Sequence, residues 1–194
     1  MDKIGFDNKE ISCEEFLDMD FSSYDFSDFQ IDDALFRNCI FSGSNFIDAA
    51  FHSVIFEGCR FSSSFENSLI DKCIFDECMI NGSIFISSRI RDTEFRSCQA
   101  RYVTFDNSVL NGVSITFSNF MDSSFSGISC KRLKIHNSDL TSSSFIGTPL
   151  SSVDLKGSTI SGLLISENGT ELKGARLDVS QALDAIRLFN VVVI

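Results

Sequence analysis

Large apolar residues recur at every fifth position along most of the chain. One series runs from Phe6 to Phe61 in steps of five, and a second runs from Phe65 to Ile165. The two series contain 33 positions, which hold 18 of the 21 Phe residues. A spacing of five matches neither the 3.6-residue period of an α-helix nor the two-residue period of a half-buried strand. The pattern therefore predicts a five-residue structural repeat.

A small residue usually stands two positions before each central apolar residue, as at Ala34, Cys39 and Ser44, and the remaining positions are mostly polar. If each unit forms one side of a square coil, the central and small residues point inward and the other three face water. Four units then make a coil of about 20 residues, and stacked coils lie about 4.8 Å apart, the spacing of hydrogen-bonded strands. The sequence thus predicts an all-β solenoid.

Residues 20 apart should then lie above one another, and the sequence supports this. A column of Phe residues recurs at 20-residue steps, with one step of 19 between Phe46 and Phe65. A column of cysteines contains the same single short step, at Cys39, Cys59, Cys78 and Cys98. One residue missing from the corner between Phe61 and Phe65 explains both columns, so we expect one continuous coil over residues 1–177, with an irregular coil at 166–171.

The cysteine column has two interpretations. Four cysteines can bind zinc, but a straight column does not easily surround a metal as a tetrahedron. We favour the alternative that Cys fills the small inward position, as Ser and Ala do elsewhere. Stacked neighbours could reach disulfide distances. However, seven cysteines without any CxxC motif are typical of a reducing cytoplasm. We expect neither a metal nor a cofactor.

Charge and motifs argue against several functions. The net charge of −11 is unfavourable for direct nucleic-acid binding, and residues 1–36 hold 11 of the 27 acids but 2 of the 16 bases. His52 and His136 are far apart on outward positions, and the chain has no phosphate-binding loop or nucleophile elbow. We therefore expect no enzyme activity. No signal peptide and no membrane-spanning apolar run is visible, so we expect a cytoplasmic protein.

The last residues, 178–194, change character. Asp178 is a predicted N-cap with Gln181 three residues later, and Leu183, Ile186 and Phe189 follow at helical spacing. We expect this short α-helix to end at Asn190, before an apolar tail. The helix could cap the open end of its own coil, or it could bury its apolar stripe against a second copy of the chain.

Several units, such as "CIFSG", "SNFID", "CRFSS" and "SDLTS", resemble pentapeptide repeats, and the resemblance covers roughly residues 4–165. It implies a right-handed quadrilateral β-helix. The C-terminal end resembles that of the Qnr and MfpA-type topoisomerase-protection proteins, in which a Leu-Asp pair opens a short helix with Gln-Ala before a Val/Ile tail. Here the matching residues are Leu177, Asp178, Gln181, Ala182 and the tail Val191 to Ile194.

This second resemblance implies a function. Such proteins dimerise end to end through the C-terminal region, and the acidic rod is proposed to mimic DNA, bind DNA gyrase or topoisomerase IV, and protect it from quinolones or peptide toxins such as albicidin. The long inserted loops of many Qnr proteins are absent here, which leaves the drug class open. The alternative is a structural or protein-interaction scaffold without a topoisomerase partner. The expected homodimer contact comprises Leu183, Ile186, Phe189, Val191 and Val193.

The columns also suggest which side of the rod contacts the partner. Units stacked on the Phe column contain no Lys or Arg at their centres or flanks, and they carry the expected partner-binding acids Asp25, Asp28, Asp48, Glu66 and Asp106. The face through Ile70, Ile90 and Cys130 instead carries Lys72, Arg89, Arg91, Lys131 and Arg132. An acidic line spaced by the coil rise could imitate phosphates. Alternatively, the acids simply keep a repetitive rod soluble.

Overall fold

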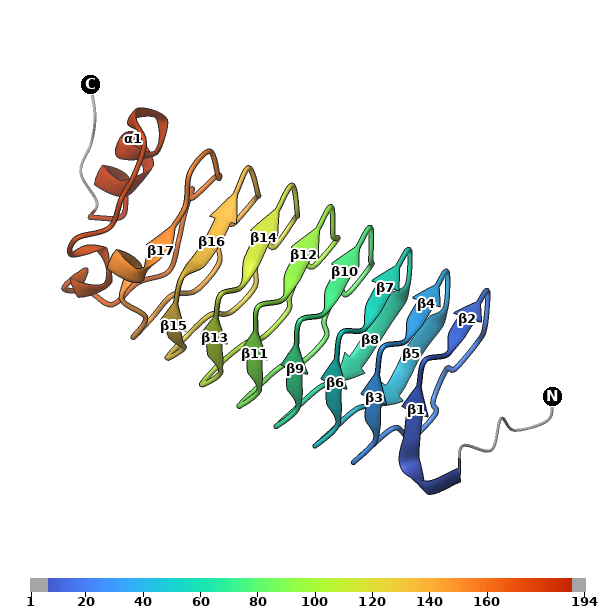
Figure 1. Cartoon of the computed structure of the whole chain (residues 1–194). Coiled ribbons are helices and arrows are strands. Elements are labelled where there is room, and N and C mark those ends of the chain that lie inside the picture. The colour runs from blue at the N-terminus through green and yellow to red at the C-terminus, as the bar shows by residue number, and fades with distance from the viewer. Residues whose placement is uncertain (1–6, 190–194) are drawn as a thin grey trace.

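Each five-residue unit forms one side of a four-sided coil, and successive coils stack into a rod with β1 (Glu10–Ser12) near one end and α1 (Val179–Arg187) at the other (Figure 1). The computed structural model describes residues 7–189. All paired strands are parallel, as a solenoid requires, and one short helix, α1, lies at the C-terminal end. The predicted fold class is therefore confirmed.

Two sides of the coil carry long parallel sheets. Sheet A contains, in order along the rod, β1 (Glu10–Ser12), β3 (Gln30–Asp32), β6 (Ala50–His52), β9 (Leu69–Asp71), β11 (Arg89–Arg91), β13 (Val109–Asn111) and β15 (Ser129–Lys131). Sheet B contains β2 (Glu15–Leu17), β4 (Leu35–Arg37), β7 (Ile55–Glu57), β10 (Ile74–Asp76), β12 (Glu94–Arg96), β14 (Ser114–Thr116), β16 (Leu133–His136) and β17 (Val153–Asp154).

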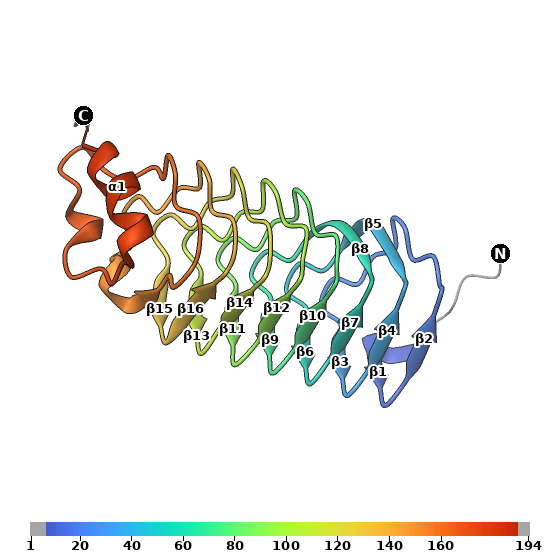
Figure 2. The same cartoon turned by 90° about the horizontal axis from the view of Figure 1, so that it is seen from above.

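The other two sides are joined mostly by isolated bridges, one residue per coil. Within the described part of the chain, the only pairing on these two sides that is longer than an isolated bridge joins β5 (Ile40–Asn45) to β8 (Arg60–Ser64). Short 3₁₀ turns begin and end the rod: η1 (Asp7–Lys9), η2 (Leu150–Ser152) and η3 (Thr170–Leu172). Figure 2 shows the coils from above, with α1 against the last of them.

Between β1 and β17 the register contains one irregularity. Residues paired in sheet A are 20 apart, except that Ala50 pairs with Leu69, only 19 residues later. The pairing of β5 with β8 shifts between Ser42 and Asn45, where Asn45 pairs with Ser64. The shorter coil thus loses its residue at the corner within β8, and the ladder continues on both sides of it.

Stacked phenyl rings fill the inside of the rod. In the Phe column, the ring centroids of Phe65 and Phe85 are 4.6 Å apart with an interplanar angle of 6°, and those of Phe46 and Phe65 are 4.7 Å apart across the shorter coil. Neighbouring columns meet edge to face, as Phe85 and Phe95 do at 87°. Because the backbone ladder sets the coil spacing, offset stacking of identical rings is the packing that fills each layer.

Small residues two positions before each centre point inward and serve a second purpose. The Ser44 hydroxyl donates to the Phe21 carbonyl at 2.7 Å, and the Cys59 thiol lies 3.2 Å from the Phe36 carbonyl, each one coil away. Inward Ser and Cys therefore pair with backbone carbonyls of the neighbouring coil. Among residues 7–189 no group of three or more His, Cys, Asp or Glu is arranged to hold a metal ion.

Candidate partner-binding surfaces

The Phe face is the side of the rod formed by the units centred on Phe26, Phe46, Phe65, Phe85, Phe105, Phe125 and Phe145. Its predicted acids occupy different outward positions. Asp25 precedes its central Phe, Glu66 and Asp106 follow theirs, and Asp28 and Asp48 are corner residues with φ of 61° and 59°. A left-handed corner favours Asn, Asp and Gly, which explains why Asp is common at this position.

The structure brings four of these acids onto three successive coils. Backbone hydrogen bonds link the corners, since the N–H of Asp28 donates to the Ile47 carbonyl and that of Asp48 donates to the Glu66 carbonyl, both at 3.0 Å. The next coil contributes Ile84, Ile86 and Ser87 instead of acids, so Asp106 is separated from the group. The acidic surface is therefore a cluster of Asp25, Asp28, Asp48 and Glu66.

Local hydrogen bonds hold two of the carboxylates. The hydroxyl and the backbone N–H of Ser27 donate to Asp25, and together they lower the pKa of Asp25 below its ordinary value. Asp106 accepts hydrogen bonds from the Ser124 hydroxyl at 2.5 Å and from the Ser126 N–H at 3.1 Å. Asp25 is thus oriented by its own coil and Asp106 by the adjacent coil, which reduces the entropy that both side chains lose on binding a partner.

The Phe face also carries a positive charge, although the units that form it contain no Lys or Arg. The ammonium of Lys9 lies 3.1 Å from a carboxylate oxygen of Asp28, and it also donates to the Ser27 carbonyl. Lys9 stands in the position where a small inward residue is expected before Ile11. A lysine is too costly to bury unpaired, so its side chain turns outward onto the acidic cluster. The unusual residue at that position was the sequence signal for this contact.

Charge is strongly segregated along the rod. Residues 1–82 hold 17 of the 27 acids and 5 of the 16 bases, so the later residues carry 10 acids and 11 bases. The entire net negative charge therefore belongs to the N-terminal part, which contains the acidic cluster.

Helix α1 closes the C-terminal end of the rod. The predicted capping box is present: Asp178 accepts from the N–H of Gln181, and the Gln181 side chain accepts from the N–H of Asp178. The buried Gln181 amide also donates to the carbonyls of Leu155 and Ser158, each at 2.7 Å. The helix ends at Arg187, three residues before the predicted Asn190, which itself lies outside the described residues. Capping of its own coil is thus one function of this helix.

A buried carboxylate contributes to the same end. Glu171 accepts from the Gly147 N–H at 2.9 Å and from the Ser166 hydroxyl at 2.6 Å. Burial alone would raise the pKa of Glu171, but these hydrogen bonds outweigh burial and lower it. Sequence analysis missed Glu171, because a single Glu in an irregular segment has no repeat position to identify it.

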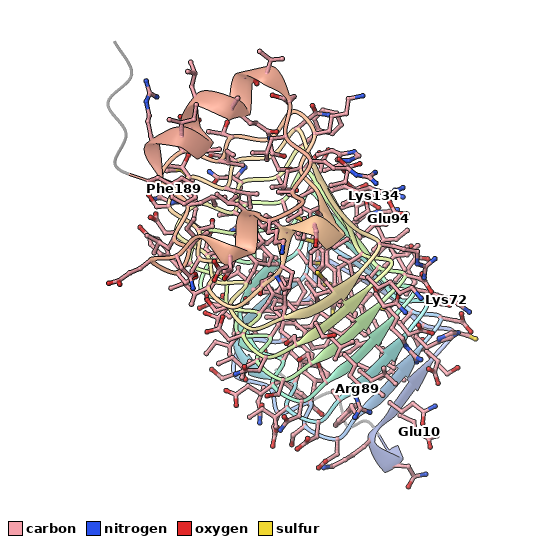
Figure 3. The ribbon with its side chains drawn as sticks, turned by 90° about the vertical axis from the view of Figure 1, so that its left-hand side faces the viewer. Glu10, Lys72, Arg89, Glu94, Lys134 and Phe189 are labelled. Carbon is pink, nitrogen blue, oxygen red and sulfur yellow. The ribbon has the colours of Figure 1, made fainter. Side chains whose placement is uncertain are left out.

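An apolar surface remains exposed beside this cap. Leu183, Ile186 and Phe189 are 47%, 42% and 48% exposed, as expected for residues that do not cap the coil. Phe189 also borders a depression of about 510 Å³, whose apolar lining includes Leu163, Leu164, Ile165 and Leu188. Figure 3 views this end of the rod and labels Phe189. The other two predicted dimerisation residues, Val191 and Val193, lie outside the described residues.

Among residues 7–189, no helix is both long enough and apolar enough to cross a bilayer.

Comparisons with known proteins agree with the repeat architecture. A family model described as a pentapeptide repeat region matches residues 49–125, and one described as pentapeptide repeats (8 copies) matches residues 30–65. A search of curated proteins finds no match.

Solved structures with a similar coil include a trypsin-treated variant of QnrB1, described as a plasmid-mediated fluoroquinolone resistance protein. It is 20% identical, with a TM-score of 0.42 over 95% of this chain and 99% of that chain. HetL of the cyanobacterium Nostoc sp. strain PCC 7120, described as involved in heterocyst differentiation regulation, is 11% identical, with a TM-score of 0.32 over 82% of this chain and 89% of that chain. The two repeat models identify pentapeptide repeats over residues 30–125, and the four-sided parallel coil continues the same five-residue architecture on both sides of that range.

Proposed function

We propose that this protein binds a type II topoisomerase, DNA gyrase or topoisomerase IV, at the surface where the enzyme binds DNA, and that it protects the enzyme from quinolones or peptide toxins. In this proposal the protein acts in the cytoplasm as a binding protein, without catalysis and without direct contact to nucleic acid.

The observation that carries the proposal is the acidic cluster on a rigid, regularly spaced backbone. Asp25, Asp28, Asp48 and Glu66 lie on three successive coils, about 4.8 Å apart per coil. A DNA-binding saddle is rich in Lys and Arg, and complementary charge steers association and sets orientation. The net charge of the N-terminal part adds long-range attraction to the same partner.

The C-terminal sequence supports the same proposal, since Leu177, Asp178, Gln181 and Ala182 match the pattern of topoisomerase-protection proteins. We further propose that the exposed stripe of Leu183, Ile186 and Phe189, extended by Val191 and Val193, joins two rods end to end. Sedimentation at micromolar concentration should then show a dimer, and a Leu183→Glu, Ile186→Glu variant should sediment as a folded monomer. A wild-type monomer at that concentration would contradict this contact.

A scaffold without a topoisomerase partner is the second candidate. The interruption of the acids at Ile84 and Ile86, and the ion pair between Lys9 and Asp28, favour it, because both make the acidic line less like a run of phosphates. The two candidates differ in one direct assay.

That assay is DNA supercoiling by purified gyrase, with and without a quinolone or albicidin, as the protein is titrated. The proposal predicts inhibition of supercoiling at high protein concentration, or rescue of drug-inhibited supercoiling, together with measurable binding. Absence of inhibition, rescue and binding would leave the scaffold as the better account.

A further inference from the structure

The second surface of interest is the sheet A face. It comprises the outward first and last residues of β3, β6, β9, β11, β13 and β15, and the corner residue after each strand. The column of last residues reads Asp32, His52, Asp71, Arg91, Asn111 and Lys131. The corner column reads Asp33, Ser53, Lys72, Asp92, Gly112 and Arg132. Figure 3 shows Arg89 on this side of the rod, and Glu94 and Lys134 on the side of sheet B.

Each column is complementary to itself when it is read in the opposite direction. If two rods lie face to face and antiparallel, with a twofold axis between β9 and β11, then β3 of one copy is opposite β15 of the other. In the same way β6 is opposite β13, and β9 is opposite β11. A twofold axis across the rods places each column against the same column of the second copy. Because both rods have the same rise of about 4.8 Å per coil, the register is kept along the face.

The outer positions then pair opposite charges. Asp32 of one copy lies opposite Lys131 of the other, and Asp33 lies opposite Arg132. Three of these side chains, Asp33, Lys131 and Arg132, are exposed, and Asp32 is partly exposed. Neither Asp32 nor Asp33 forms an ion pair within the described chain, and the same holds for Lys131, whereas Arg132 lies 3.3 Å from a carboxylate oxygen of Asp92 in its own chain. The twofold axis produces each of these contacts twice.

The central positions are complementary as well. Asp71 lies opposite Arg91 of the second copy, and Lys72 lies opposite Asp92. Within one chain, Arg91 already contacts Asp71 at 3.5 Å, so the paired copies would form a closed ring of two aspartates and two arginines around the axis. Networks of this kind stabilise more than isolated surface ion pairs do.

Between the charged positions the face is shallow. Ala50 lies opposite Val109 of the second copy, and Ser53 lies opposite Gly112, over which the Asp92 carboxylate and the Arg132 guanidinium of the same chain lie. A depression of about 660 Å³ over β3, β6 and β9 is lined by Asp32, Ala50, His52 and Asp71, among others. It provides space for the long side chains that the second copy presents from β13, β15 and the corners after them.

Other arrangements lack this match. A shift of the axis onto β9 places Asp71 opposite Asp71 and Lys72 opposite Lys72. A parallel arrangement about a twofold axis along the rods places the column of last residues against the column of first residues at the same level, so that Arg91 faces Arg89 and both Asp32 and Lys131 face uncharged residues. Like charges directly opposite one another are unfavourable. Charge complementarity therefore selects the antiparallel register with the axis between β9 and β11.

We propose that the sheet A face is a lateral interface on which a second copy of this chain docks antiparallel in that register. The contact is independent of the proposed end-to-end contact and of any topoisomerase partner. Because the face is narrow and its contacts are mainly ionic, the association is weak and falls steeply with salt.

Sedimentation of charge-reversed chains tests the interface, in a Leu183→Glu, Ile186→Glu background that removes contact through the C-terminal apolar surface. The background chain should associate at about 0.02 M salt and dissociate at about 0.5 M salt. Asp32→Lys with Asp33→Lys should weaken this association about tenfold or more. This weakening is expected even though the two substitutions make the chain less negative and so reduce the general repulsion between chains. Lys131→Glu with Arg132→Glu, which reverses the other side of the same ion pairs, should weaken self-association to a similar extent.

An equimolar mixture of these two variants should associate again, since each reversed pair then meets its complement at both ends of the interface. Asp76→Lys with Glu77→Lys is the matched control, because these residues hold the same positions on sheet B and change the net charge equally. The control should not weaken association. Absence of association at low salt, equal loss in the control, or absence of recovery in the mixture would each overturn the proposal.

Zero-length carbodiimide cross-linking tests the register. Lys131 and Asp32 of one chain are five coils, or about 24 Å, apart, so a direct amide bond between them can form only between two chains. The proposal predicts this cross-link at low salt. Cross-links between chains that exclude the pairing of β3 with β15 would contradict the register.

Discussion

Removal of one stacked ring tests whether the phenyl column holds the rod together. Phe85 is fully buried, and its ring lies 4.6 Å from that of Phe65 and 5.0 Å from that of Phe105. Truncation of a buried Phe to Ala costs about 3–5 kcal/mol, including the cavity that it leaves. The hydrogen-bonded backbone fixes the coil spacing on both sides, so the cavity cannot close easily. We therefore expect Phe85→Ala to lower the free energy of unfolding by about 4–5 kcal/mol.

The measurement is urea unfolding followed by far-UV circular dichroism, with Ser87→Ala as the control. Ser87 is an exposed corner residue two positions later, with φ of 58°, and Ala carries the same Cβ as Ser. The control should change stability by less than about 0.5 kcal/mol. Equal effects of the two substitutions, or a loss of less than about 1.5 kcal/mol for Phe85→Ala, would refute this account of the core.

Three further predictions concern the cap and the thiols. Gln181→Ala removes the hydrogen bond to the Ser158 carbonyl and one of the two hydrogen bonds to the Leu155 carbonyl, which keeps the N–H of Ser158. It should therefore destabilise the protein by about 1–3 kcal/mol and increase amide exchange in the last coil first; unchanged exchange would contradict the cap. Because the folded state lowers the pKa of Glu171, its contribution is complete above its ordinary value of 4.5 and is lost as the pH falls through the folded pKa. The acid-induced loss of stability should therefore be smaller in Glu171→Gln than in wild type. Burial raises the pKa of Cys73 and Cys98 to about 12, so their thiols are almost entirely protonated and unreactive near neutral pH. Iodoacetamide should therefore modify the exposed Cys13 first in the folded protein, and mass spectrometry measures the order of modification. Early modification of Cys98 would contradict this prediction.

Much of the fold follows from the sequence because one rule repeats in every coil. The inward positions, the columns and the single 19-residue step could all be predicted, since a ladder of parallel strands leaves little freedom in register. The exceptions occur where a residue departs from the rule. Phe29 fills a position meant for a small residue and is buried against Phe26, with ring centroids 5.3 Å apart. Phe117 is 69% exposed at a left-handed corner, and nothing in the structure explains it.

The surfaces were harder to predict because the repeat does not determine where a long charged side chain points. Lys9 belongs to a unit of sheet A, yet it neutralises Asp28 on the Phe face. Asp71 and Asp92 would be suitable control residues for the acidic cluster only if their carboxylates were unpaired, but both form ion pairs with arginines. Position in the repeat fixes the face of each residue, whereas its partners depend on the length of the side chain and on the neighbouring coils.

Position-matched neutralisation tests the central proposal most directly. One variant replaces the cluster with Asp25→Asn, Asp28→Asn, Asp48→Asn and Glu66→Gln. Its control removes the same number of charges from the same repeat positions on other faces, by Asp139→Asn, Asp18→Asn, Glu77→Gln and Asp76→Asn, none of which forms an ion pair within the described residues.

Both variants should fold like wild type, and affinity for purified gyrase in the absence of DNA is then measured. The proposal predicts a loss of about tenfold or more for the cluster variant and a much smaller loss for the control. Equal losses would show that only net charge matters, and unchanged affinity in the cluster variant would contradict binding through the acidic cluster.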